Sequence, residues 1–164
     1  MKRVILVRHA KAVPYGYDDD INRKLKDSGK EDAKKVSAKL KEDKVFPDLI
    51  ISSPAKRAFK TAKIYVETLD YSKKRIHVEE DLYDGMTTSD FIDLLRDLPE
   101  KAETVFFFGH NPTFQYLAHN LLRFFNSDMP TCSTVAIDFD IDNWEKVASR
   151  EGVAAFHLKP REYR

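Results

Sequence analysis

The chain has 164 residues, of which 42% are hydrophobic and 12% aromatic, which suits one globular domain over residues 1–164 and excludes a disordered chain. Its 28 basic and 27 acidic residues leave a net charge of +1, so we expect no nucleic-acid or membrane partner. Its one cysteine, Cys132, excludes an internal disulfide, and the lack of an apolar run long enough for a signal peptide or a membrane span predicts a cytoplasmic protein.

Short apolar runs alternate with helical patterns along the chain. The predicted elements are, in chain order, a strand over 4–7, a polar stretch over 14–22, a helix over 28–43, a strand over 49–51, a helix over 54–69, a strand over 76–78, a helix over 88–98, a strand over 104–108, a helix over 112–125, and strands over 134–141 and 153–158. The run VILV at 4–7 is apolar throughout, which is typical of a strand buried on both faces. Ser28 and Glu31 form the capping-box pattern of a helix start.

This alternation predicts an α/β fold, a three-layer α/β/α sandwich with a mostly parallel central sheet and helices on both faces. Ligands of such sheets bind beyond the carboxyl ends of the strands. Arg8 and His9 follow the first strand, and Arg57 falls in the first turn of the helix after the second. His110 follows the strand at 104–108. We therefore expect two arginines and two histidines to converge at one rim.

Such a cluster suits a phosphoryl group or another tetrahedral anion. Guanidinium groups match phosphate oxygens with forked donors, and helix N-termini add backbone N–H groups. A histidine there can act as a nucleophile or as a hydrogen-bond donor. Because the sequence has no Walker motif and no dense carboxylate cluster, we expect a route through histidine with no metal and no cofactor. His77, His119 and His157 lack metal-ligand spacing and are interpreted as ordinary structural residues.

Each candidate also has an ordinary interpretation when it is taken alone. Arg57 could be a solvated helix residue, and His110 could lie in a capped turn. Arg23 is a candidate for the pocket edge or a surface arginine. Ser53 either contributes to anion binding or caps the following helix. Tyr15 and Tyr17 (in the polar stretch) could contact a substrate or pack.

Three motifs, in order, resemble those of the histidine phosphatase superfamily, the group that includes phosphoglycerate mutase. LVRHAKA at 6–12 resembles its Leu-x-Arg-His-Gly/Ala signature, SSPAKRAFKTA at 52–62 its Ser-Pro-x-x-Arg-x-x-x-Thr-Ala element, and GHNPTF at 109–114 its second histidine motif. The pattern Asp20-x-x-Arg23-x-Leu25-x-x-x-Gly29 resembles the segment that leads into its first helix. The resemblance covers nearly the whole chain and implies a phosphoglycerate mutase-like fold.

Within the superfamily the chain most resembles the short SixA-type phosphohistidine phosphatases. The Arg-His-Ala-Lys-Ala variant, the Gly-His-Asn-Pro element and the small size carry this likeness. Longer members have a cap insertion over the site, for which the stretch between Arg57 and Thr104 leaves no room. The resemblance thus implies an open site, suited to phosphohistidine displayed on another protein.

The resemblance also implies roles. His9 would be the nucleophile, with its second ring nitrogen oriented by an acceptor such as a backbone carbonyl. Arg8 and Arg57 would clamp the phosphoryl oxygens, and His110 would donate to the transferring group. In Leu82-Tyr83-Asp84-Gly85, Asp84 occupies the position where the family often has an acid. Whether Asp84, Glu79, Glu80 or no side chain is the general acid stays open.

The leading hypothesis is a metal-independent phosphatase that forms phospho-His9 and acts on protein phosphohistidine. A small-molecule phosphomonoesterase or mutase is the first alternative. A catalytically silent module that binds phosphoproteins is the second, because the acid position is weak. The partner is accordingly a phosphorylated protein or a small phosphorylated substrate, and the oligomeric state stays open.

Overall fold

The computed structural model describes residues 1–14, 16 and 19–164. The predictions for Tyr15 and Tyr17 lie outside the described residues. The six strands form one sheet in the order β3-β2-β4-β1-β5-β6. Their bounds are β1 Lys2–Arg8, β2 Leu49–Ser52, β3 His77–Val78, β4 Thr104–Gly109, β5 Thr134–Phe139 and β6 Val153–Leu158.

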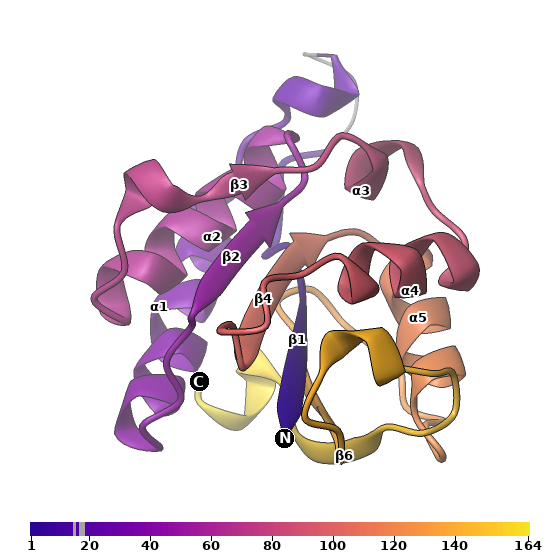
Figure 1. Ribbon diagram of the computed structural model, residues 1–164. Helices are drawn as coiled ribbons and strands as arrows, with labels where there is room; N and C mark the ends of the chain where they lie inside the picture. The colour runs from indigo at the N-terminus through magenta and orange to yellow at the C-terminus, as the bar shows by residue number, and fades with distance from the viewer. Residues whose placement is uncertain (15, 17–18) are drawn as a thin grey trace.

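The sheet is mostly parallel, as predicted. Strands β3, β2, β4 and β1 run in one direction, and β5 pairs with β1 antiparallel, followed by β6 antiparallel to β5. In Figure 1 the arrowheads of β2 and β4 point to the top of the molecule, where α3 (Asp81–Asp84) and the 3₁₀ turn Asp20–Asn22 lie. This edge is the rim at which ligands of parallel sheets bind.

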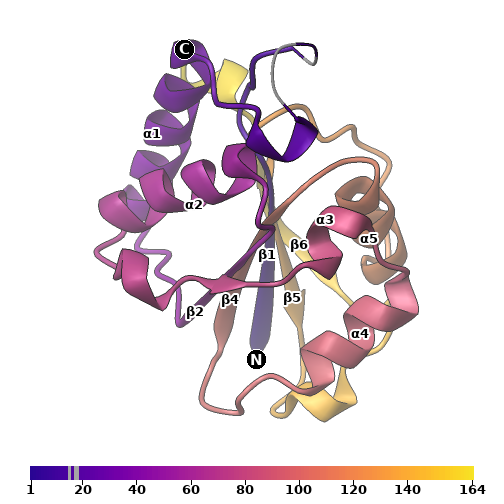
Figure 2. The same cartoon turned by 90° about the horizontal axis from the view of Figure 1, so that it is seen from above.

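The sheet is buried on both faces, which explains the continuous apolar strands. Along β4, Val105 and Phe107 face one core while Phe106 and Phe108 face the other. Helices α1 (Asp27–Glu42) and α2 (Lys56–Thr68) cover one face, and α4 (Thr88–Arg96) and α5 (Thr113–Leu121) cover the opposite one (Figure 2). Each large side chain buried there stabilises the fold by about 2–3 kcal/mol. The predicted three-layer α/β/α sandwich is confirmed.

Some helix ends differ from the predictions. The capping box was wrong, because α1 begins at Asp27 and its N-cap, Lys26, makes no side-chain cap. Helix α5 ends at Leu121, four residues early, because Leu122 turns extended and forms a bridge to Gly152. The four-residue helix α3 was not predicted, since one turn is too short to show a periodic pattern.

Between α2 and β4 the chain forms a 3₁₀ turn, β3, α3 and α4, with no large cap insertion. Within the described residues, no helix has the length and apolar character needed to cross a membrane.

Candidate active site

The ends of β1 and β4 bring two histidines together. The parallel register pairs Arg8 with Gly109, so the residues that follow, His9 and His110, leave the sheet side by side. The His9 backbone N–H donates to the Gly109 carbonyl at 2.9 Å, and the two imidazole ring centroids lie 5.2 Å apart. The structure thus brings His9 and His110 together at the carboxyl ends of two neighbouring parallel strands.

The His9 ring is held in one tautomer. Its Nδ1 lies 2.8 Å from the Ala10 carbonyl oxygen, which can only accept, so Nδ1 carries the proton. Within the described part of the chain no hydrogen bond engages Nε2. Burial, followed by the nearby charges of Arg57 and Arg8, outweighs the hydrogen bond to Ala10 and lowers the pKa of His9 to about 4. At neutral pH, His9 is thus an uncharged imidazole with an unprotonated Nε2, oriented by a backbone carbonyl as expected.

His110 is oriented by Ser53. The Ser53 Oγ accepts from the Ala55 N–H at 3.2 Å and lies 2.8 Å from His110 Nε2, in a hydrogen bond that either group can donate. His110 Nδ1 is buried and has no partner among the described residues. Burial lowers the pKa of His110 to about 3 and keeps the ring neutral. Ser53 is fully buried and both caps the turn and positions His110.

The two arginines lie near His9 and keep donors free. The Arg8 Nη1 donates to the Met129 carbonyl at 2.9 Å, which fixes the side chain. Arg57 is only 5% exposed. The Nε atoms of both arginines are buried without a partner among the described residues, like His110 Nδ1. Buried donors are nearly always satisfied in proteins, so the two unpaired Nε–H donors of the arginines near His9 favour the binding of an anion there.

Sequence reasoning missed the role of Asp20, although it quoted the motif that contains it. The Asp20 carboxylate accepts from Arg57 Nη2 at 3.1 Å, Arg23 Nε at 3.0 Å and the Tyr83 hydroxyl at 2.8 Å. Burial alone would raise the pKa of Asp20, but the hydrogen bonds from Tyr83, Arg57 and Arg23 outweigh it and hold the pKa at about 2. Asp20 is therefore a fixed anion that orients Arg57.

The structure does not bring Asp84 into this hydrogen-bonded cluster. Asp84 is exposed at the end of α3, and its neighbour Tyr83 reaches the site instead, with its ring 5.7 Å from that of His110. Glu80 is exposed, and Glu79 accepts from the Asp81 N–H at 3.4 Å. None of the carboxylates considered for the acid role forms a hydrogen bond or ion pair with the two histidines in the described chain.

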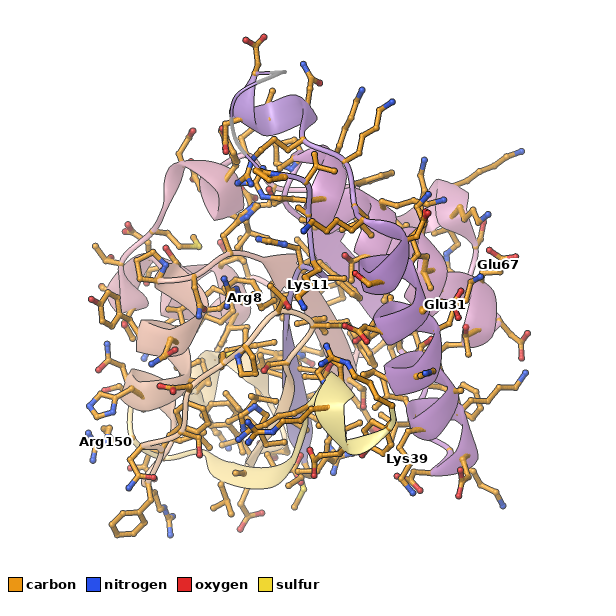
Figure 3. The ribbon with its side chains drawn as sticks, turned by 180° about the vertical axis from the view of Figure 1, so that it is seen from behind. Arg8, Lys11, Glu31, Lys39, Glu67 and Arg150 are labelled. Atoms are coloured by element: carbon orange, nitrogen blue, oxygen red, sulfur yellow. The ribbon has the colours of Figure 1, made fainter. Side chains whose placement is uncertain are left out.

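A hydrogen bond links two segments near the histidines, whose side chains are largely buried. The Tyr83–Asp20 hydrogen bond joins α3 to the 3₁₀ turn, and His9 and His110 are each only 9% exposed. Figure 3 shows Arg8, the last residue of β1, near the middle of the molecule, whereas Glu31 and Glu67 lie at its outer surface on α1 and α2.

Neutral buried histidines make the fold sensitive to mild acid. Chiefly through burial, the pKa of His9 falls to about 4, that of His110 to about 3 and that of His157 to about 4, against about 6.5 in an unfolded chain. Below about pH 6.5 the unfolded chain binds more protons, so the free energy of unfolding decreases from there towards about pH 4.

Denaturant unfolding at about pH 7.5 and about pH 5 measures this difference. The variant His77→Asn, at an exposed position, should show the same decrease as the wild type. An unfolding free energy that does not fall between these two pH values would contradict the neutral, buried rings.

Residues 4–89, more than half of the chain, match the histidine phosphatase superfamily (branch 1). One relative, the uncharacterized chloroplastic protein At3g52155 of Arabidopsis thaliana, is 26% identical over 170 residues, covering 96% of this chain and 76% of its own length.

Solved structures share the fold. The protein histidine phosphatase SixA complexed with tungstate superimposes with a TM-score of 0.85 at 21% identity, over 99% of both chains. The putative phosphohistidine phosphatase SixA from Agrobacterium tumefaciens gives a TM-score of 0.77 at 22% identity, over 97% of this chain and 99% of its own. A mycobacterial glucosyl-3-phosphoglycerate phosphatase gives 0.66 at 17% identity, over 93% and 98%.

Proposed function

The chain belongs to the histidine phosphatase superfamily, branch 1, and is a phosphatase; we propose that it acts as a single domain to remove the phosphoryl group from phosphohistidine on another protein. The reaction passes through a covalent phosphohistidine at His9 and needs no metal ion. One observation carries this proposal. The His9 Nδ1–H is held by the Ala10 carbonyl at 2.8 Å, and Nε2 carries no hydrogen bond among the described residues, beside buried donors.

In the first step, the lone pair of His9 Nε2 attacks the phosphorus of the bound phosphoryl group. A bond forms between Nε2 and phosphorus, and the bond from phosphorus to the substrate nitrogen breaks. The leaving imidazole departs neutral when its other nitrogen is already protonated, so it keeps the electron pair without a further proton. The Ala10 carbonyl stabilises the positive charge that appears on the His9 ring.

In the second step, water attacks the phosphorus of phospho-His9, the bond to Nε2 breaks, and inorganic phosphate leaves with neutral His9 restored. Arg8 and Arg57 supply positive charge to the phosphoryl oxygens in both steps, and His110 Nδ1–H donates to one of them. Two guanidinium groups in a desolvated site can do the charge neutralisation that a metal ion does elsewhere, which supports the metal-free route.

Phosphohistidine fits this site better than a phosphomonoester because, among the described residues, Asp20 is held ionised and Asp84, Glu79 and Glu80 make no hydrogen bond to His9 or His110. An alkoxide leaving group needs a proton from a general acid, whereas a protonated imidazole does not. Tungstate, the ligand of one SixA structure with the same fold, is a tetrahedral oxyanion like the phosphoryl group. We propose the cytoplasm as the compartment, because a lone cysteine suits a reducing environment.

The variant Asp84→Asn should keep phosphohistidine turnover within about threefold of the wild type, because the leaving group needs no acid. Steady-state phosphate release measures this. A loss of a hundredfold would assign the acid role to Asp84 and contradict the acid-free mechanism.

Turnover in EDTA tests the proposed function. The wild type should release phosphate from a phosphohistidine peptide and from phosphoramidate in excess EDTA, and much more slowly from phosphoglycerate or a sugar phosphate. Rapid release from the monoesters alone would favour the small-molecule enzyme. Tight binding of the phosphopeptide with no release would favour the silent binding module.

A further inference from the structure

A cavity of about 340 Å³ is lined by residues of α1, of α2 and of the segments that precede these two helices. Its charged lining consists of five lysines, Lys24, Lys30, Lys56, Lys60 and Lys63. Its apolar lining is made by Leu25, Pro54 and Phe59.

Two residues that line the cavity are adjacent in sequence to residues of the active site. Lys56 precedes Arg57 in the chain, and Pro54 follows Ser53, which hydrogen-bonds to His110. On α2 the lysines at 56, 60 and 63 are spaced by four and three residues, so they share one helix face. Figure 2 shows the 3₁₀ turn Asp20–Asn22, which holds Arg57, beside the start of the same helix.

The lysines of this cavity carry a local excess of positive charge despite the near-zero net charge of the chain. Among the described residues only Lys30 of the five has an ion-pair partner, Asp27 at 3.9 Å. Further along α1 a lysine is instead paired with an acid: Lys39 Nζ lies 3.2 Å from Asp43 Oδ1. Unpaired like charges around one cavity repel each other, and the binding of an anionic group among them lowers their electrostatic free energy.

We propose that this lysine cavity binds an acidic segment of the phosphorylated partner protein. One apolar side chain of that segment packs against the apolar lining formed by Leu25, Pro54 and Phe59. The inference rests on the proposed function and adds the chemistry of the partner. Charge complementarity favours carboxylates, and the apolar lining, including half-buried Phe59, favours a peptide over a nucleic-acid backbone. Because Lys56 and Pro54 are sequence neighbours of Arg57 and Ser53, a segment bound in the cavity would hold its phosphohistidine on the same side of the molecule as the active site.

Two matched phosphohistidine peptides test the docking surface, one flanked by glutamates and a leucine, the other by serines. For the wild type at low salt, kcat/KM should be about tenfold higher for the acidic peptide, an advantage that falls as salt rises. The double variant Lys56→Glu/Lys60→Glu should lose this advantage. The control Lys74→Glu/Lys101→Glu, which reverses two exposed charges elsewhere, should keep it.

Binding of the unphosphorylated acidic peptide, followed by fluorescence anisotropy, separates docking from catalysis. Weaker binding to Lys56→Glu/Lys60→Glu than to the control supports the surface even if no phosphate is released, in which case the proposed function alone has failed. Turnover of phosphoramidate without any preference for the acidic peptide overturns the docking surface alone. Tighter binding of a single-stranded oligonucleotide than of the peptide, lost in the same variant, would also overturn it.

Discussion

Replacing His9 by asparagine should reduce phosphohistidine turnover by at least about a thousandfold, because losing the nucleophile removes the covalent route altogether. The loss should appear in kcat with phosphoramidate as well as with a phosphopeptide. Asparagine cannot form the stable phosphoramidate link that an imidazole nitrogen forms. The side chain is smaller than histidine, so the fold should persist, and thermal unfolding of the variant checks this.

The matched control for His9→Asn is His77→Asn. His77 lies exposed on the edge strand β3, far along the chain from the rim motifs. The His77→Asn variant should release phosphate from phosphohistidine at the wild-type rate. If the folded His9→Asn variant retained more than about a tenth of the activity, another nucleophile or a direct attack of water would have to replace the mechanism.

Replacing Arg57 by alanine should lower kcat/KM by about a hundredfold to a thousandfold, since one preorganised charged donor contributes about 3 kcal/mol in the transition state. Arg57 is nearly buried and is held in place by the Asp20 backbone carbonyl at 2.7 Å and the Asp20 carboxylate at 3.1 Å. Alanine removes the charge and leaves the Asp20 carboxylate near the anion site.

Arg57→Lys should recover only part of this loss, because an ammonium group cannot bind Asp20 and a phosphoryl oxygen with the same forked geometry. Arg75→Ala, at an exposed position, serves as the control and should keep wild-type kinetics. Steady-state kinetics of all three variants with phosphoramidate measures these differences. Equal activity of Arg57→Ala and the control would contradict the placement of Arg57 at the phosphoryl group.

The strand ends made the centre of the site predictable. His9 and His110 follow two apolar strands, and neighbouring parallel strands end at the same edge of a sheet. The pattern of buried strands also predicted the three layers, because only a sheet covered on both faces needs strands as apolar as the run at 104–108.

The residues that surround and orient Arg57, Asp20 and Tyr83, could not be predicted as site residues, because their placement depends on contacts between segments distant in sequence. In the folded chain, Asp20 of the 3₁₀ turn hydrogen-bonds to Arg57 of α2 and to Tyr83 of α3, which are distant from it in sequence. In a helix of one turn, the sequence does not indicate whether Tyr83 or Asp84 faces inward, since adjacent side chains point about 100° apart. Tyr83 is the residue of this turn that lies against His110, and the identity of a general acid stays a prediction.

Trapping the phosphoenzyme tests the central claim most directly. The protein is mixed with labelled phosphoramidate in EDTA, quenched in base and digested, and the labelled peptide is identified by mass spectrometry. We expect an acid-labile, base-stable label on His9 of the wild type and none in His9→Asn. Steady phosphate release with no label at His9, or with an acid-stable label on another residue, would contradict covalent catalysis through this histidine.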